Sequence, residues 1–97
     1  MAYAAAKAGI EVLSQELAAQ AGPDGGRVNC LAPETILTER NQQQIPEAIQ
    51  DQLRHTHPVQ RLGTPDDLAH AALFLASDHS SWISGITLDI AGGSVLV

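Results

Sequence analysis

A tyrosine and a lysine stand four residues apart near the start of the chain, at Tyr3 and Lys7. On a helix, residues at this spacing share a face. A phenol titrates near pH 10 and carries protons poorly at neutral pH, but a neighbouring ammonium group stabilises its anion. The chemistry that this pair favours is proton transfer to or from an alcohol or carbonyl oxygen. The spacing alone is weak evidence, since an exposed helical pair of this kind is common.

The segments around this pair read as alternating helices and strands. Residues 2–20 are rich in alanine and carry apolar side chains at helical spacing, and the glycine-rich run 22–26 ends the helix. The small side chains of this helix predict close packing on more than one side. Residues 27–32 read as a short buried strand, and residues 86–90 alternate as a second strand.

A polar segment and a second helix lie between the two strands. Residues 33–41 read as a loop, and the polar stretch 39–57 reads as a separate flap that contains a short amphipathic helix. Thr64 and the Pro-Asp-Asp sequence after it form a strong helix start, because threonine caps and acidic residues suit the positive end of the dipole. This helix is apolar nearly all round to Ala76, which predicts burial.

The order helix, strand, flap, helix, strand predicts an α/β fold with a parallel pair of strands. A right-handed crossover joins such a pair. A parallel sheet needs cover on both faces and more than two strands to be independently stable. The sequence therefore predicts the end of a larger α/β domain, with poor stability on its own.

Several motifs accompany the tyrosine–lysine pair in a defined order along the whole chain. In this order and spacing they resemble the short-chain dehydrogenase/reductase family. The resemblance implies a partial Rossmann-type fold, in which residues 1–97 are the C-terminal helix–strand–helix–strand portion and the N-terminal cofactor-binding half is absent. The motifs are Tyr3 to Lys7 with Gly9 and Ile10, Arg27-Val28-Asn29, Pro33 with Ile36 and Thr38, 61–69, 73–78, and 83–85 followed by Gly92-Gly93.

The resemblance implies an oxidoreductase that moves a hydride between NAD or NADP and an alcohol or carbonyl substrate. Tyr3 would then exchange a proton with the substrate oxygen, and Lys7 would favour the phenolate and hold the nicotinamide ribose. The loop from Pro33 to Thr38 would lie over the nicotinamide, with the backbone of Ile36 binding its carboxamide. Tyr3 and Lys7 are thus the candidate catalytic residues, and these two with Pro33, Ile36 and Thr38 are the candidate cofactor-binding residues.

Some features of the family pattern are changed or missing. Glu34 stands where the family usually has glycine, Gly26 replaces an apolar residue, and Ala91 replaces an aspartate. The segment 39–57 corresponds to the family's variable substrate-covering region, so no substrate can be read from it. No phosphate-binding loop, cofactor-selecting residue or catalytic serine occurs in the 97 residues, which predicts that this chain alone is inactive.

Other side chains that could bind a metal ion or react are better explained by structural roles. His55 and His57 lack a third ligand nearby, so no metal site is predicted. Cys30 is expected to be a buried strand thiol, which behaves as a small apolar group. His70 is expected in a core or an interface, and Trp82 is expected to pack the turn into the last strand.

Composition excludes several classes of function. The net charge of -6 argues against binding nucleic acid or an anionic membrane. No segment resembles a membrane span or an export signal, so a cytoplasmic protein is expected. The partners expected are a small alcohol or carbonyl substrate and, in a full-length form, further copies in a dimer or tetramer. The alternative is a non-catalytic oligomerisation or interaction module, because the apolar helices resemble the family's subunit contacts.

Overall fold

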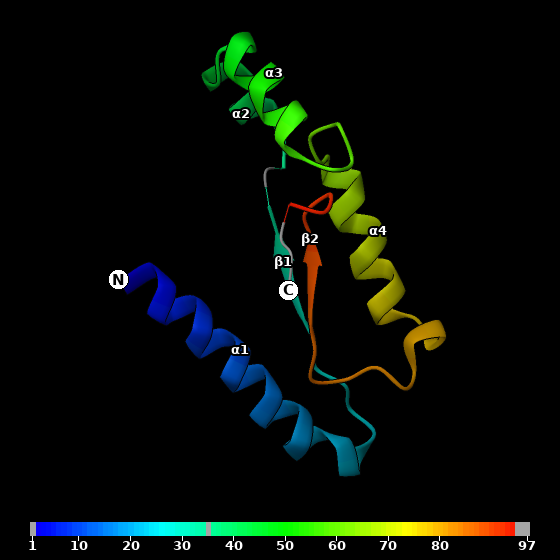
Figure 1. Cartoon of the computed structure of the whole chain (residues 1–97). Coiled ribbons are helices and arrows are strands. Elements are labelled where there is room, and N and C mark those ends of the chain that lie inside the picture. The colour runs from blue at the N-terminus through cyan, green and yellow to red at the C-terminus, as the bar shows by residue number, and fades with distance from the viewer. Residues whose placement is uncertain (1, 35, 95–97) are drawn as a thin grey trace. The chain divides into compact units, whose positions relative to one another are not determined.

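The computed structural model describes residues 2–34 and 36–94, and Figure 1 shows the course of the chain. Short 3-10 turns follow the first and last helices at Gly22–Asp24 and Asp78–Ser80. The other elements, in order, are α1 (Ala2–Ala21), β1 (Cys30–Pro33), α2 (Glu39–Gln44), α3 (Glu47–Thr56), α4 (Pro65–Ala76) and β2 (Thr87–Ile90).

The two strands pair side by side in a parallel sheet. The Cys30 N–H donates to the Ile86 carbonyl at 2.9 Å, and four residues on, the Glu34 N–H donates to the Ile90 carbonyl at 3.1 Å. Both strands advance in the same direction through this register, which confirms the predicted parallel α/β arrangement.

The chain divides into two compact units, and the division passes through β1, β2 and α4. The α1 unit comprises Met1–Leu31 and Leu73–Leu88, and the flap unit comprises Ala32–Ala72 and Asp89–Val97. The tyrosine–lysine pair belongs to the first unit, and the predicted substrate-covering segment belongs to the second.

Within the α1 unit, the long helix contacts the chain around β1 and β2 through small side chains. The Ser14 hydroxyl lies 2.8 Å from the Cys30 sulfur, and a Cβ added at Gly85 would meet the Ala18 Cβ at 3.6 Å. Gly26 begins the run into β1, where an added Cβ would lie only 2.9 Å from the Ala21 Cβ. The departure from an apolar residue at Gly26 therefore has a steric reason, since the chain passes too close to the helix end for a side chain.

The Arg27 guanidinium group donates hydrogen bonds to the end of α4 and to the turn that follows it. One terminal nitrogen donates to the Ser80 hydroxyl and the Ile83 carbonyl, both at 3.1 Å. The other donates to the carbonyls of Leu75 at 3.0 Å and Ser77 at 3.2 Å. The last carbonyls of a helix lack intrahelical partners, so a cation with several donors suits this position. Ser80, which receives one of these bonds, is 1% exposed.

The flap unit begins with an element that the sequence analysis missed. Residues 39–41 were predicted as loop, but α2 already begins at Glu39, because the Thr38 hydroxyl accepts the Asn41 N–H and caps the helix. The buried Gln50 of α3 then joins the two short helices, with its amide donating to the carbonyls of Gln42 at 3.2 Å and Ile45 at 2.9 Å.

The predicted burial of the two long helices is wrong for the part of the chain that the structure describes. Neither α1 nor α4 contains a buried residue, and Leu73 of α4 is 70% exposed. His70 is exposed, so the expectation that it lies in a core is wrong, and its place in an interface stays a prediction. A sheet of two short strands offers too little apolar surface to cover helices of 20 and 12 residues. None of the helices in the described ranges is both long and apolar enough to cross a membrane.

The expectation for Trp82 is also wrong. Its side chain is 98% exposed and does not pack the turn before β2. Backbone and short polar groups hold that turn instead, because Ser80 is buried against the Arg27 network and the Asn29 side-chain amide donates to the Ile83 carbonyl at 3.1 Å.

Candidate functional site

The tyrosine–lysine pair lies on α1 as the spacing predicts. The Lys7 Nζ atom lies 5.4 Å from the centre of the Tyr3 ring, one helical turn away. At this distance a cation is attracted to the face of an aromatic ring. The Tyr3 side chain is 75% exposed, so its hydroxyl is open to a substrate or to water. The arrangement places an ammonium group beside a phenol that is free to exchange a proton.

The loop after β1 forms a second group of candidate residues, in the flap unit. The Thr38 hydroxyl accepts the Asn41 N–H at 3.1 Å, so its own proton remains available for donation. The Asn41 amide donates in turn to the Ile36 carbonyl at 3.2 Å. This small network sets the conformation of the backbone at Ile36 and Thr38, while Pro33 closes β1 and is exposed.

A backbone bridge fixes where this loop runs. Ile36 pairs in parallel with Gly63, and the Leu37 N–H donates to the Gly63 carbonyl at 2.8 Å. Within residues 2–34 and 36–94, the Ile36 N–H donates to no acceptor. Ile36 thus offers an N–H group that can bind an amide oxygen or another polar acceptor.

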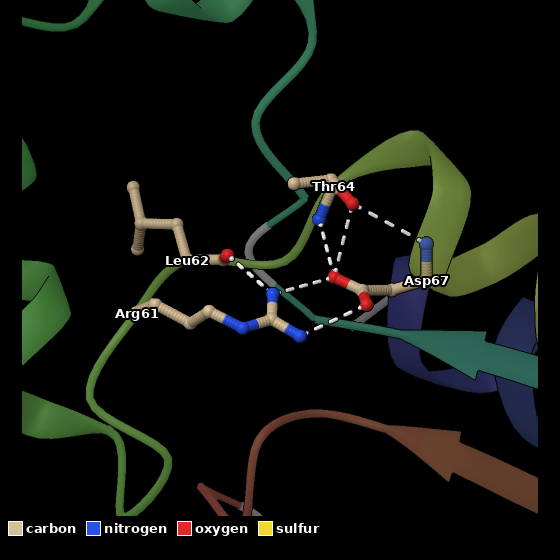
Figure 2. A network of polar contacts seen from close by, with 4 residues as sticks. All are labelled: Arg61, Leu62, Thr64 and Asp67. Atoms are coloured by element: carbon tan, nitrogen blue, oxygen red, sulfur yellow. Dashed lines mark hydrogen bonds and ion pairs between the residues drawn. The ribbon is translucent and has the colours of Figure 1, made fainter.

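Figure 2 shows the polar network that holds the segment carrying Gly63. The Arg61 guanidinium group binds the Asp67 carboxylate through two hydrogen bonds of 2.7 and 2.9 Å, and it also donates to the Leu62 carbonyl. The Thr64 N–H donates to the same carboxylate at 2.8 Å, and the Asp67 N–H donates back to the Thr64 hydroxyl at 3.3 Å. This reciprocal pair is a helix cap, which confirms the role predicted for Asp67 at the start of α4.

The electrostatics of this network follow from the same contacts. The hydrogen bonds from Arg61 and from the Thr64 backbone hold the pKa of the Asp67 carboxyl group well below its usual range. In return, the hydrogen bond and charge of Asp67 raise the pKa of the Arg61 guanidinium group. Both groups therefore stay ionised at neutral pH, and the cap of α4 stays intact.

The two histidines at the end of α3 bind backbone rather than each other. The Nδ1 atom of His55 lies 2.7 Å from the Asp51 carbonyl, and the Nδ1 atom of His57 lies 2.6 Å from the Leu53 carbonyl. In the described ranges of the chain, no three histidine, cysteine, aspartate or glutamate side chains are grouped to hold a metal ion. Cys30 is buried as predicted, with its sulfur against Ser14.

A cavity of about 500 Å³ in the α1 unit lies away from the tyrosine–lysine pair. Its lining includes Ala18 and Gly22 at the far end of α1, together with Arg27 and Trp82. Fifteen residues of α-helix separate Tyr3 from Ala18, which is roughly 22 Å along the axis. The cavity is therefore not the space in which Tyr3 and Lys7 would act.

Sequence reasoning missed Asn41, Gln50 and the position of His57. Thr38 followed three residues later by a polar side chain is a helix-start signal that would have pointed to the Asn41 network. No comparable local signal marks Gln50 or His57, because their partners are carbonyl groups exposed only by the ends of the two short helices.

Comparison with known proteins gives the class of this chain. The family model that matches residues 1–94 is described as enoyl-(acyl carrier protein) reductase. The match covers nearly all of the chain, including both strands of the parallel α/β arrangement. The chain belongs to the short-chain dehydrogenase/reductase family.

Characterised relatives agree with this assignment. The chain is 46% identical over 94 residues to 7alpha-hydroxysteroid dehydrogenase of Escherichia coli K12. The matched residues make up 96% of this chain and 36% of the relative. The chain is 43% identical over 95 residues to 3-oxoacyl-(acyl-carrier-protein) reductase of Chlamydia muridarum, which is 94% of this chain and 36% of that protein. The chain thus spans little more than a third of the length of the relatives that it matches.

Solved structures give the same result. A 3-oxoacyl-(acyl-carrier protein) reductase from Brucella melitensis superposes with a TM-score of 0.87 at 37% identity, over 97% of this chain and 35% of that one. A second reductase structure from Brucella melitensis, with bound NAD, superposes with a TM-score of 0.81 at 38% identity, over 97% of this chain and 34% of that one.

Proposed function

We propose that this chain forms the catalytic-helix portion of an NAD- or NADP-dependent dehydrogenase/reductase that interconverts an alcohol and a carbonyl compound. The observation that supports the proposal most directly is the Tyr3–Lys7 pair on α1, with the ammonium nitrogen 5.4 Å from the ring centre. Relatives whose names specify a hydroxysteroid dehydrogenase and a 3-oxoacyl reductase act on this kind of group.

In the proposed reaction, Tyr3 moves the proton. During carbonyl reduction its hydroxyl group donates a proton to the substrate oxygen, and during alcohol oxidation the phenolate accepts that proton. The Lys7 Nζ atom, 5.4 Å from the centre of the Tyr3 ring, places a positive charge beside the group that moves the proton. The nicotinamide, when bound, supplies or accepts the hydride at the substrate carbon.

The residues present fit a nicotinamide cofactor. The N–H of Ile36 has no acceptor in the described part of the chain and suits a carboxamide oxygen. The Thr38 hydroxyl, which already accepts a hydrogen bond from Asn41, keeps its proton for a ligand oxygen. Lys7 would hold the ribose hydroxyls, and Pro33 would border the same site at the end of β1.

The segment 39–57 would cover the substrate. It consists of the short helices α2 and α3, which Gln50 joins through two hydrogen bonds. The proposal extends to a cytoplasmic whole protein that assembles as a dimer or tetramer. The phosphate loop and the catalytic serine of the family would come from outside the 97 residues of this chain. The chain alone is therefore expected to be inactive.

The alternative is a non-catalytic oligomerisation or interaction module derived from the same family. The exposed apolar side chains of the helices favour it, because large exposed apolar surfaces mark association sites. They include Ile10, Val12, Leu13, Leu17 and Leu73.

Replacing Tyr3 by phenylalanine in the whole protein separates the two functions. Removing the hydroxyl group should lower turnover of a ketone substrate by about 10²- to 10⁴-fold and leave NADH or NADPH affinity within a few-fold. The measurements are steady-state kinetics and cofactor binding followed by fluorescence. Turnover equal to that of the unsubstituted protein would overturn the enzymatic proposal, whereas loss with intact binding would exclude the purely structural alternative.

A further inference from the structure

The last residue of the segment 39–57 is a buried histidine. His57 ends α3 and is 5% exposed. Its Nδ1 atom lies 2.6 Å from the Leu53 carbonyl, which can only accept, so Nδ1 carries the ring proton and donates it. Leu53 belongs to the last turn of α3, where carbonyl groups need partners from outside the helix ladder. The ring of His57 therefore caps the end of the helix.

The other ring nitrogen of His57 has no such partner. Nε2, like Nδ1, is a ring nitrogen that can form a hydrogen bond. Nε2 is buried and makes no hydrogen bond within the residues that the structure describes. A leucine or isoleucine would fill this space without an unsatisfied nitrogen, so packing alone does not favour histidine here. An aliphatic side chain would leave the Leu53 carbonyl with the Thr56 hydroxyl, at 2.8 Å, as its remaining side-chain donor and would remove the shorter bond from the ring.

The same ring lies against the turn that follows β2. The Cδ2 atom of His57, which neighbours Nε2 in the ring, would be 3.5 Å from a Cβ at Gly92. An added Cβ at Gly93 would be 3.0 Å from Pro58, and the Val59 N–H donates to the Gly92 carbonyl at 2.9 Å. Three consecutive residues after α3 thus lie close to two consecutive glycines, and we name the set of His57, Pro58, Val59, Gly92 and Gly93 the flap joint.

We propose that His57 is a positioning residue that orients the substrate-covering segment on the Gly92–Gly93 turn. The proposal rests on the proposed function, because residues 39–57 cover a substrate only if the chain is part of a dehydrogenase. The Nδ1 proton caps α3 while the opposite edge of the ring packs on Gly92, so the direction of α3 is set against the end of β2. His57 acts through the position of the flap and touches no reacting atom.

Four substitutions at this position in the whole protein test the role of the donor. His57→Asn places an amide nitrogen where Nδ1 stands, and His57→Gln places it near Nε2 instead. His57→Leu and His57→Val remove the donor altogether. Losing the bond should raise the KM for substrate about tenfold in the glutamine, leucine and valine variants, with kcat within about twofold. The asparagine variant should restore KM to within about twofold of the unsubstituted protein.

The comparison of asparagine with glutamine decides the proposal even if the aliphatic variants fail to fold, because both amides are polar and similar in size. An equal KM for these two variants would overturn it, as would an unchanged KM in all of them. Tyr3→Phe, measured beside them, keeps the two proposals separate. If Tyr3→Phe retains turnover, the proposed function fails, whereas if it loses turnover and KM does not follow the donor at His57, only the positioning role fails.

Discussion

The two units stabilise their local structure by different means. In the α1 unit a helix of 20 residues has no buried side chain, and its polar contact with the strand region is Ser14 against Cys30. In the flap unit, helices of 6 and 10 residues are held by buried polar side chains at Gln50 and His57. The tyrosine and lysine that would do chemistry thus lie on a helix without any buried residue.

This difference shows which part of the molecule depends on other surfaces. A helix of this length gains most of its stability in proteins from packing one apolar face. The exposed apolar residues of α1 therefore require cover from outside the described residues if Tyr3 and Lys7 are to be held in a defined geometry. The flap unit instead has side chains that satisfy its own helix ends, so its local structure depends less on such cover.

After loss of the Tyr3 hydroxyl group, removing the charge of Lys7 should give the next largest loss of turnover in the α1 unit. Tyr3 is 75% exposed, so solvent screens the interaction to about 1 kcal/mol, or roughly fivefold in rate. Lys7→Gln in the whole protein should lower kcat/KM by about this factor, whereas Lys7→Arg keeps the charge and should lose much less. Steady-state kinetics would measure both variants, and equal losses would contradict an electrostatic role.

Breaking the Arg27 network tests how much the α1 unit depends on one side chain. Arg27→Met removes four hydrogen bonds and leaves helix-end carbonyls without donors, so the free energy of unfolding should fall by about 3 kcal/mol. Urea unfolding of the whole protein would measure it. Arg40→Met, on the exposed surface of α2, is the matched control and should change the free energy by less than about 0.5 kcal/mol.

A pair of glycine substitutions compares the two units directly. Gly93 has a φ of 85° and would bring a Cβ to 3.0 Å from Pro58, so Gly93→Ala should destabilise the protein by about 2 kcal/mol. Gly22, at the end of α1, would place a Cβ with nothing within 4 Å, and Gly22→Ala should be nearly neutral. Thermal unfolding of both variants measures the difference, and equal shifts would remove the steric argument for the flap joint.

The smallest expected effect is the pH dependence of the α4 cap. The pKa of the Asp67 carboxyl group is lower in the folded chain than in an unfolded one, so unfolded Asp67 binds a proton first as the pH falls. The stabilisation by Asp67 is therefore present above about pH 4 and is lost progressively below it. Asp67→Asn should be less stable than the unsubstituted protein at pH 7, and the gap should shrink toward pH 2. A gap that stays constant in urea unfolding would contradict the role of this ion pair.

Local features of the molecule could be predicted from the sequence. Three such features depend on residues close together in the chain. They are the helix start at Thr64 with Asp67, the strand that ends at Ile90 before Gly92, and the shared face of Tyr3 and Lys7. Such features can be predicted because the interacting groups are close in sequence. A capping side chain, for example, accepts a hydrogen bond from the backbone N–H group three residues later.

Burial could not be predicted in the same way. The apolar pattern of α4 shows which side chains favour burial, but whether Leu73 is covered depends on surfaces that its own helix does not supply. His57 is the opposite case, since a polar residue became buried because the Gly92–Gly93 turn, 35 residues further on, lies against it. The candidate cofactor-binding residues Pro33, Ile36 and Thr38 came from the family resemblance, and their roles remain proposals.

The exposed indole of Trp82 provides the protein with a spectroscopic reporter. Trp82 is the only tryptophan in the chain and is 98% exposed, so its emission should lie at the long wavelengths typical of indole in water and be readily quenched by iodide. Any surface that covers the turn before β2 would remove water from the ring and shift the emission to shorter wavelengths. The emission wavelength of Trp82 would therefore show whether another surface covers the turn before β2, without any added label.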